Sequence, residues 1–371
     1  MNKIEILDCT LRDGSYVIDN HFSKSDTTLI SSVLFNSGIN YVEVGHGLGL
    51  GANGKKYGKS LCTDDEYIFN SSQSKINKKN KVGVFCFPSI ATFKQIKSAK
   101  INGLDFIRIG VDLNNINKSK KIIEYSKELD LKVFANLVKT YSYSALDIAK
   151  KAQKLENFGA DIICLVDSAG AMLPDEIKNY FKTSKKFLNK DTLLNFHGHN
   201  NLGFANSNCM HAIDGGAKII DTSIMGMGRS AGNAVTEMMI PVLQRKGLIS
   251  KKVDLITILN LANKIISNLN PKNQYQPESI LYGKSYFHSG FRGKLLSFTK
   301  KNKISFYNTL NNFSFKKILN VNDDLLKKEI LKNKKIKYSC KTKNIKYPPI
   351  DVNNKLEFND ILSFKKYLKS E

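Results

Sequence analysis

One recurring unit most constrains the fold: a short apolar segment followed by a longer helical pattern, repeated along the first two thirds of the chain. Most of these segments are continuous runs of Val, Ile, Leu and Phe, which is typical of strands buried on both faces of a parallel sheet. The eight strand candidates are residues 4–9, 41–44, 81–87, 105–111, 132–138, 161–166, 192–196 and 218–223. Eight such units in about 250 residues favour a closed (β/α)8 barrel, a TIM barrel of the α/β class, over an open doubly wound sheet, because no glycine-rich dinucleotide fingerprint follows the first strand.

Helix boundaries support the same organisation. Glycines that permit the left-handed turn closing a helix stand just before strand candidates, at Gly38, Gly103, Gly159 and Gly216. Residue types typical of helix starts are Ser23 or Ser25, Thr63 and Pro174. We expect the barrel at residues 1–250, a helical segment flanking the barrel mouth at 251–295 with a helix at 255–269, and a Lys- and Asn-rich appendage at 296–371. The fold is then a barrel with a small, mainly helical C-terminal extension.

Composition agrees with a folded globular protein. Of the 371 residues, 42% are hydrophobic and 24% charged, which is enough apolar content for one large core or two ordinary ones. No apolar run approaches the roughly 18 to 20 residues of a membrane span, and the N-terminus lacks a secretory hydrophobic region, so we expect a cytoplasmic protein. The 6 cysteines include no Cys-x-x-Cys pair, and we expect no disulfides.

The formal net charge of +24 raises the question of nucleic-acid binding, because clustered basic residues release counterions from phosphate backbones. Lysine carries nearly all of this charge, and it lacks the planar fork with which arginine reads bases and phosphates. The arginines are Arg12, Arg108, Arg229, Arg245 and Arg292. We therefore expect a lysine-rich solvated surface rather than a nucleic-acid partner.

In such a barrel, the loops that follow the strands gather at one end and carry the chemistry. Polar residues follow six of the strand candidates: Asp8, Arg12 and Asp13 the first, Glu43 and His46 the second, Lys139 the fifth, Asp167 and Ser168 the sixth, His197 and His199 the seventh, and Arg229 and Asn233 the eighth. These residues are the candidates for a functional site.

His197 and His199 are the most informative pair among them. Side chains two apart in a strand point to the same face, so both imidazoles can reach one ion; the alternative is two hydrogen-bonded polar residues at a strand end. Asp13 follows the first strand, which in a closed barrel lies next to the eighth and near the seventh, so its carboxylate could face the histidines. Its hard oxygen favours Mn²⁺ or Mg²⁺ over a closed structural zinc.

Two further features each have a functional and a purely structural interpretation. Beside an ion, Arg12 would be a permanently charged donor for an enolate or carboxylate oxygen; otherwise it is the local ion-pair partner of Asp13. The glycine-rich stretch at residues 226–233 would bind an anion through backbone N–H groups at the start of a helix; otherwise it needs small residues only to turn tightly.

Together these motifs resemble those of the DRE-TIM metallolyases, the HMG-CoA lyase-like or pyruvate carboxyltransferase domain family of barrel lyases and synthases. The resemblance covers roughly residues 4–245. It rests on five stretches in the family's order: 8–14 with Arg-Asp-Gly, 43–47, 167–170, 197–203 with His-Gly-His, and 228–233. Within the family, residues 43–51 and 167–172 look most like the 4-hydroxy-2-oxovalerate aldolases.

The resemblance implies a divalent-metal-dependent aldolase. Such an enzyme cleaves a 4-hydroxy-2-oxo acid into pyruvate and an aldehyde, or forms the acid from these two compounds. A 2-oxo acid would chelate the ion through its carboxylate and ketone oxygens, and cleavage would pass through a metal-bound pyruvate enolate. The ion implied is Mn²⁺, with Mg²⁺ or Co²⁺ as alternatives.

The resemblance also implies roles for individual residues. The expected metal ligands are Asp13, His197 and His199, with Asn233 as a direct or water-mediated ligand. Arg12 would stabilise the enolate, and the expected substrate contacts are Arg12, Asp13, Ser168 and Tyr286, the last of which would shape the aldehyde pocket.

One departure from the aldolase pattern concerns the general base. Where the aldolases place a catalytic histidine, two residues after the glycine of the Arg-Asp-Gly motif, this chain has Tyr16. A phenol with an unperturbed pKa of about 10 is a poor base at neutral pH unless the ion or Arg12 lowers that pKa. The identity of the general base stays open among Tyr16, His21, His46 and a metal-bound water. We take Arg12, Tyr16 and His46 as the candidate catalytic residues.

Two other functions stay open. Isopropylmalate-synthase-like enzymes condense an acyl-CoA with a 2-oxo acid at a similar metal site, but they usually carry a glutamate in the first motif, where Ser15 and Tyr16 stand here. A basic binding protein on a barrel scaffold would fold without metal and bind nucleic acid in a salt-dependent manner. As partners we expect a 2-oxo acid and an aldehyde, a second copy of the chain in a homodimer, and, from the resemblance, an aldehyde dehydrogenase at the C-terminal region.

Overall fold

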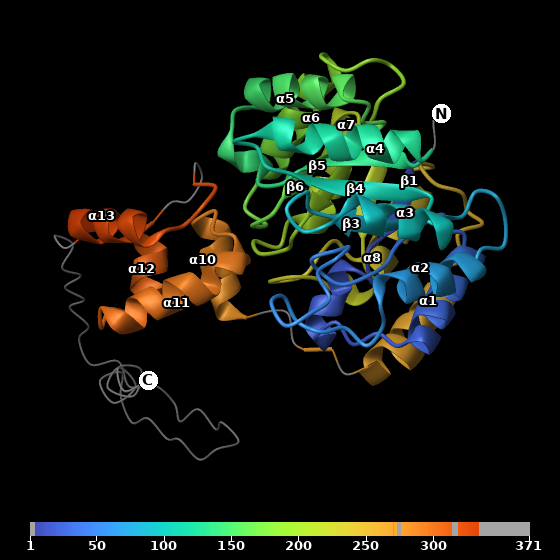
Figure 1. Ribbon diagram of the computed structural model, residues 1–371, viewed down its shortest axis with the longest axis horizontal. Coiled ribbons are helices and arrows are strands. Elements are labelled where there is room, and N and C mark those ends of the chain that lie inside the picture. The colour runs from blue at the N-terminus through green and yellow to red at the C-terminus, as the bar shows by residue number, and fades with distance from the viewer. Residues whose placement is uncertain (1–3, 270, 273–275, 314–317, 334–371) are drawn as a thin grey trace. The chain divides into compact units, whose positions relative to one another are not determined.

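A closed parallel β-barrel occupies the first part of the chain in the computed structural model, which describes residues 4–269, 271–272, 276–313 and 318–333 (Figure 1). Within these residues the strands pair in chain order and the last pairs with the first. They are β1 Glu5–Asp8, β2 Tyr41–Glu43, β3 Lys81–Cys86, β4 Phe106–Val111, β5 Lys132–Leu137, β6 Ile162–Asp167, β7 Leu193–Gly198 and β8 Ile219–Thr222. Each strand candidate overlaps one of them, so the predicted (β/α)8 barrel is confirmed.

The barrel closes through β1 and β8, where Leu7 lies opposite Asp221 and Asp8 opposite Thr222 in a parallel register. Every residue of β4 and β6 is buried, which is why these strands are mostly apolar on both faces. Arg108 in β4 is nevertheless fully buried. Its partners belong to the site described below.

A helix follows each strand and packs on the outside of the barrel (Figure 1). These helices are α1 Lys24–Asn36, α2 Asp64–Gln73, α3 Phe93–Ile101, α4 Lys120–Glu128, α5 Ala145–Asn157, α6 Pro174–Lys185, α7 Ala205–Gly215 and α8 Thr236–Arg245. Short 3₁₀ turns lie in the loops: η1 Asp13–Ile18, η2 Ile116–Ser119, η3 Thr140–Ser142 and η4 Ile224–Gly226. Of the two serines considered for the first helix, Ser23 is the cap, and it forms a capping box with Asp26. Gly38, at a φ of 92°, turns the chain after α1 as predicted.

The described residues after α8 form a mainly helical extension, as predicted. Its elements are α9 Leu255–Leu261, η5 Ala262–Ile266, η6 Ser267–Leu269, α10 Pro277–Lys284, η7 Ser289–Phe291, α11 Arg292–Lys301, α12 Phe306–Asn312 and α13 Asp323–Asn333. The helix predicted at 255–269 begins at Leu255, but it changes to a π-helical turn at Ala262 and to a 3₁₀ turn at Ser267.

The chain divides into two compact units, Met1–Asp323 and Asp324–Glu371. The boundaries expected at residues 250 and 295 stay predictions, and the part of the appendage beyond residue 333 lies outside the described residues. None of the helices in the described ranges is both long and apolar enough to cross a membrane. The described cysteines, Cys9, Cys62, Cys86, Cys164 and Cys209, are free and buried, and Cys340 lies outside the described residues.

Candidate active site

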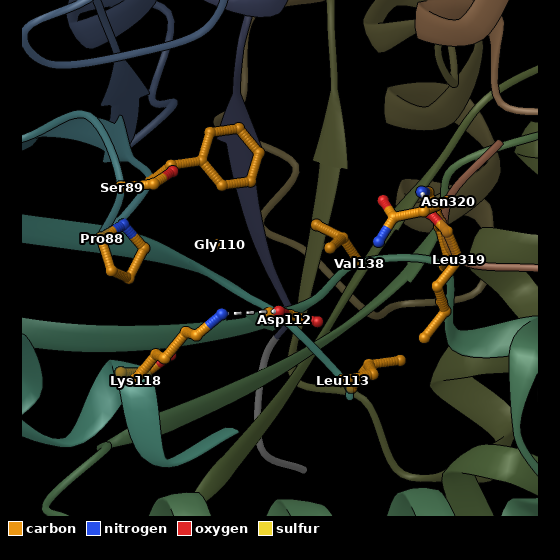
Figure 2. Close-up of a pocket in the computed structure, with 12 residues that line it drawn as sticks. Pro88, Ser89, Gly110, Asp112, Leu113, Lys118, Val138, Leu319 and Asn320 are labelled. Carbon is orange, nitrogen blue, oxygen red and sulfur yellow. Dashed lines mark hydrogen bonds and ion pairs between the residues drawn. The ribbon is translucent and has the colours of Figure 1, made fainter. Parts of the chain in front are cut away.

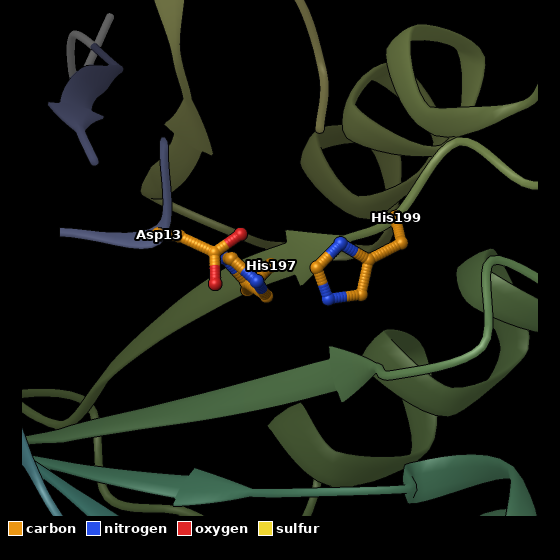
Figure 3. Close-up of side chains that lie close together, drawn as sticks. All are labelled: Asp13, His197 and His199. Carbon is orange, nitrogen blue, oxygen red and sulfur yellow. The ribbon is translucent and has the colours of Figure 1, made fainter. Parts of the chain in front are cut away.

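Three side chains with metal-binding atoms converge at the carboxyl ends of the strands (Figure 3). Asp13 opens η1 after β1, His197 lies in β7, and His199 follows β7, where it forms a bridge with Asn233. One ligand atom from each of the three lies within 4.8 Å of the others, and all three residues are buried. The two-residue period of β7 and the closure of the barrel thus place together the residues that the sequence singled out.

Hydrogen bonds orient both imidazole rings. His197 Nδ1 lies 3.0 Å from Asp221 Oδ2, and His199 Nδ1 lies 3.3 Å from the carbonyl oxygen of Gly232. These contacts engage Nδ1, so Nε2 is the nitrogen that each ring can offer to an ion, as is usual for metal-binding histidines. Burial lowers the pKa of His199 to about 4 against the opposing charge of Asp13, so this ring is neutral at pH 7 and able to ligate.

The Asp13 carboxylate is held in its charged form. Burial alone would raise its pKa, but the charge of Arg12, the two histidines when they are protonated and the hydrogen bond from Asn233 outweigh burial and hold the pKa below its usual range. Arg12 Nη1 donates to Oδ1 of Asp13 at 2.7 Å, and Asn233 Nδ2 donates to Oδ2 at 2.9 Å.

The donor set fits a divalent cation. Asn233 Oδ1 is buried and has no hydrogen-bond partner among the described residues, and a buried oxygen in that condition is costly unless something binds it. An ionised carboxylate, two imidazoles and an amide oxygen suit Mn²⁺ or Mg²⁺ with positions left for a substrate.

A network of buried charges connects residues inside the barrel to these ligands. Arg12 Nε donates to Glu43 Oε2 at 2.9 Å, and Arg108 Nη1 donates to the same oxygen at 3.1 Å. Arg108 also donates to Asp221 Oδ2, the oxygen that His197 contacts. Each charged group in this network contacts a group of opposite charge, which a dry interior requires because unpaired buried charges are costly. The network therefore positions both Arg12 and His197.

A cavity of about 380 Å³ opens onto the three ligands. The predicted site residues in its wall are Arg12, Asp13, Tyr16, Ser168, His197 and His199. Asn233 is not part of this wall but donates a hydrogen bond to Asp13, as described above. The structure thus brings together all but two of the predicted site residues.

Those two, His46 and Tyr286, do not line the cavity. His46 is buried in the loop after β2, where its Nδ1 accepts a hydrogen bond from the Leu48 N–H at 3.1 Å. Tyr286 packs against Tyr141 with ring centroids 5.4 Å apart. His21, also weighed as a base, is likewise not part of the wall.

Tyr16 is the one candidate base whose side chain lines the cavity. Burial raises its pKa, although the guanidinium of Arg229, 4.4 Å from the ring centroid, opposes this rise. The phenol is therefore protonated at neutral pH and able to donate a hydrogen bond.

Several residues of the site did not emerge from the sequence as site residues. Arg108 and Asp221 lie within the barrel and contact Glu43 and His197, respectively. A charged residue inside an apolar strand, as in Phe-Ile-Arg-Ile-Gly-Val, is the signal that could have identified Arg108. Phe291 and Asn320 also reach the cavity from the residues after the barrel, and no local pattern indicates them. His288 reaches it from the segment that the sequence predicts at the barrel mouth.

Known proteins share both this sequence pattern and this architecture. The HMGL-like family model matches residues 3–265. A protein of Geobacillus genomosp. 3 named 4-hydroxy-2-oxovalerate aldolase is 37% identical over 266 residues, covering 72% of this chain and 77% of that protein. One of the same name from Bacillus thuringiensis (strain Al Hakam) is 32% identical over 289 residues, covering 78% of this chain and 83% of that protein. In fold, the chain is similar to the HMG-CoA lyase of Bacillus subtilis, with a TM-score of 0.58 and 18% identity, covering 77% of this chain and 99% of that one.

Proposed function

The chain belongs to the HMGL-like family and is a lyase of the aldolase kind, and we propose on this premise that it is a divalent-metal-dependent aldolase acting on a 4-hydroxy-2-oxo acid. The products of cleavage would be pyruvate and an aldehyde. The observation that carries the proposal is the convergence of Asp13, His197 and His199 within 4.8 Å, with Arg12 in the same cavity wall.

Asp13, His197 and His199 would hold the ion, with Asn233 beside them, and Mn²⁺ is the ion we expect. When bound, the ion supplies a Lewis acid for the carboxylate and ketone oxygens of a 2-oxo acid. Arg12 donates from the same wall to the oxygen on which negative charge develops as the C3–C4 bond breaks.

Tyr16 would act on the other half of the substrate. The 4-hydroxyl group must lose a proton when the C3–C4 bond breaks, and a phenol with a raised pKa does not take that proton at neutral pH. Since His21 and His46 do not line the cavity, a water molecule held at the ion would be the acceptor among the four candidates. We propose instead that Tyr16 donates a hydrogen bond to the C4 oxygen and holds it in place. Phe85, Phe87 and Phe291 form an aromatic part of the wall, which excludes water from the reacting atoms.

The test combines metal analysis of the purified protein with a pyruvate-release assay over a panel of 4-hydroxy-2-oxo acids. We expect release that depends on Mn²⁺ and does not depend on acetyl-CoA. Asp13→Ala and His199→Ala each should lower turnover by roughly a thousandfold or more, because either change removes a ligand of the ion. His211→Ala is the matched control, since this histidine on α7 bonds only the Ser207 carbonyl within its own helix among the described contacts. Unchanged pyruvate release in either site variant would refute the assignment.

The same assay separates the alternatives. A synthase would consume acetyl-CoA together with the 2-oxo acid, whereas a basic binding protein would show no turnover and would bind nucleic acid with a strong salt dependence. The homodimer and the aldehyde dehydrogenase partner are proposals that light scattering of the purified chain, alone and mixed with a dehydrogenase, would test.

A further inference from the structure

The proposed reaction leaves two positive charges of the cavity wall without a role. Lys139 follows β5, Arg229 follows β8, and both line the cavity. Lys139 Nζ donates to the carbonyl oxygen of Leu319 and lies 4.3 Å from the centroid of the Phe291 ring. The Arg229 guanidinium lies over the Tyr16 ring. In the part of the chain that the structure describes, neither side chain forms an ion pair with a carboxylate.

The electrostatics of the wall favour an anion at this place. Among the described lining residues, Asp13 is the only carboxylate, and it belongs to the metal ligands. Burial, with the charge of Arg229, lowers the pKa of Lys139 to about 8 against the opposing charge of Asp112. Burial and the charges of Arg229 and Lys139 also hold the pKa of His288 well below its usual value. The two cations therefore act on the same space, and a negative group between them would relieve their repulsion.

The backbone at Lys139 gives an independent indication. Its φ of 61° lies in the left-handed region, which residues with a side chain rarely adopt. The Ser168 hydroxyl accepts a hydrogen bond from the Lys139 N–H at 2.9 Å and helps to hold this conformation. Strained backbone of this kind persists where the surrounding structure enforces it, and it is common at binding sites.

A second pocket has a volume of about 230 Å³ (Figure 2). It adjoins the cavity, because residues of its lining also line the cavity. The two spaces share Phe87, Val138, Lys139 and Asn320. The carboxylate of the second pocket, Asp112, is 3.6 Å from Lys118 Nζ. Lys139 thus lies at the boundary of the two spaces. Together they leave room for a substrate longer than a two-carbon aldehyde. Because the carboxylate of Asp112 in the second pocket would repel an anion, the cavity side of Lys139 is the better place for one.

We propose that Lys139 and Arg229 bind an acidic group, a carboxylate or a phosphate, carried by the aldehyde half of the substrate. The inference rests on the proposed aldolase function and narrows its substrate class to 4-hydroxy-2-oxo acids with a second negative charge. The first carboxylate is matched by the ion and Arg12, so the second is the group for which Lys139 and Arg229 provide the counter-charge.

The test measures kcat/KM for aldol formation from pyruvate with Mn²⁺ and two matched pairs of aldehydes. Succinic semialdehyde against butanal tests a carboxylate, and glyceraldehyde 3-phosphate against glyceraldehyde tests a phosphate. For wild type we expect a preference of at least about tenfold for the charged member of one pair, and that pair identifies the group. Lys139→Met should remove most of the preference and Lys139→Arg should retain it. Lys24→Met, at an exposed ion pair with Glu66 that lines neither space, is the control and should leave the ratio unchanged.

Equal values for charged and neutral aldehydes, or a preference that survives Lys139→Met, would overturn the inference. Exchange of the pyruvate methyl protons with deuterated water reports on the metal and Arg12 half of the site without any aldehyde. Exchange without a charge preference refutes the inference and leaves the aldolase proposal standing. A wild-type protein without exchange or aldol product refutes the proposed function and the inference with it.

Discussion

Tyr16 occupies the position where the aldolase pattern places a catalytic histidine, and its surroundings fix both its place and its protonation. Its ring leaves no room for a side chain at Gly47, where a Cβ would lie 2.7 Å from Tyr16 Cζ. Burial raises the pKa of the phenol, and Arg229 over the ring only partly offsets this. The residue that replaces the histidine is therefore a hydrogen-bond donor at the pH where the enzyme is expected to work.

Tyr16→Phe removes the hydroxyl and keeps the ring. We expect kcat to fall about tenfold, the effect of one hydrogen bond to the C4 oxygen, while the dependence of kcat on pH between about 6 and 9 keeps its shape. Tyr307→Phe, at a tyrosine that is 54% exposed on α12, is the control. A variant that loses the acidic limb of the pH profile would show that Tyr16 takes the proton after all.

Single residues differ in how far the sequence reveals them. Asp13, His197 and His199 could be predicted because strand periodicity and barrel closure determine where they point. The cationic role inferred for Lys139 and Arg229 could not, because it depends on which carboxylates lie nearby in space. His46 looks like a site residue by its position after β2, yet its ring turns back onto the Leu48 N–H of its own loop.

Among the secondary-structure elements, β2, β4 and β8 do not pair with one another in the barrel, yet buried ion pairs join them. Arg108 in β4 bonds Glu43 in β2 and Asp221 in β8, and all three side chains are fully buried. The ion pairs hold the strand ends that carry the site: Glu43 shares its charge between Arg108 and Arg12, and Arg108 is the only arginine that pairs with Asp221 among the described residues.

Arg108→Met removes that counter-charge and retains an unbranched apolar side chain. We expect the free energy of unfolding, measured by urea denaturation, to fall by about 3–5 kcal/mol, because Asp221 is left buried with the His197 ring alone and Glu43 keeps only Arg12. Lys120→Met, in the exposed pair with Glu124, is the control and should change it by less than about 0.5 kcal/mol. A decrease in the free energy of unfolding of less than about 1 kcal/mol for Arg108→Met would contradict the structural role of these ion pairs.

The strands were predictable as elements because burial on both faces leaves a continuous apolar run, as in β6. The helices of the C-terminal extension were harder to predict. The helix from Leu255 changes to a π-helical turn at Ala262, although the residues there, Ala-Asn-Lys-Ile-Ile, include no glycine or proline that would interrupt a helix. Packing around this segment, which a local pattern does not encode, decides its hydrogen bonding.

At the scale of the whole molecule, the cavity is built by two parts of the chain. The barrel loops supply the metal ligands and Arg12, and the segment after the barrel supplies His288, Phe291 and Asn320. The sequence predicted a helical segment at 251–295 flanking the barrel mouth, but not which of its side chains line the cavity, because that depends on contacts between residues far apart in the chain. In the proposed reaction, the barrel loops therefore determine the class of chemistry, whereas the barrel loops and the segment after the barrel together determine which aldehyde fits.

The central claim is that one divalent ion binds between the ends of β1 and β7. Anomalous X-ray scattering from crystals grown with Mn²⁺ measures this directly. We expect a strong peak in contact with the Asp13 carboxylate and with Nε2 of His197 and His199, and its loss in His199→Ala. A manganese peak elsewhere in the molecule, with none at these three side chains, would contradict the account.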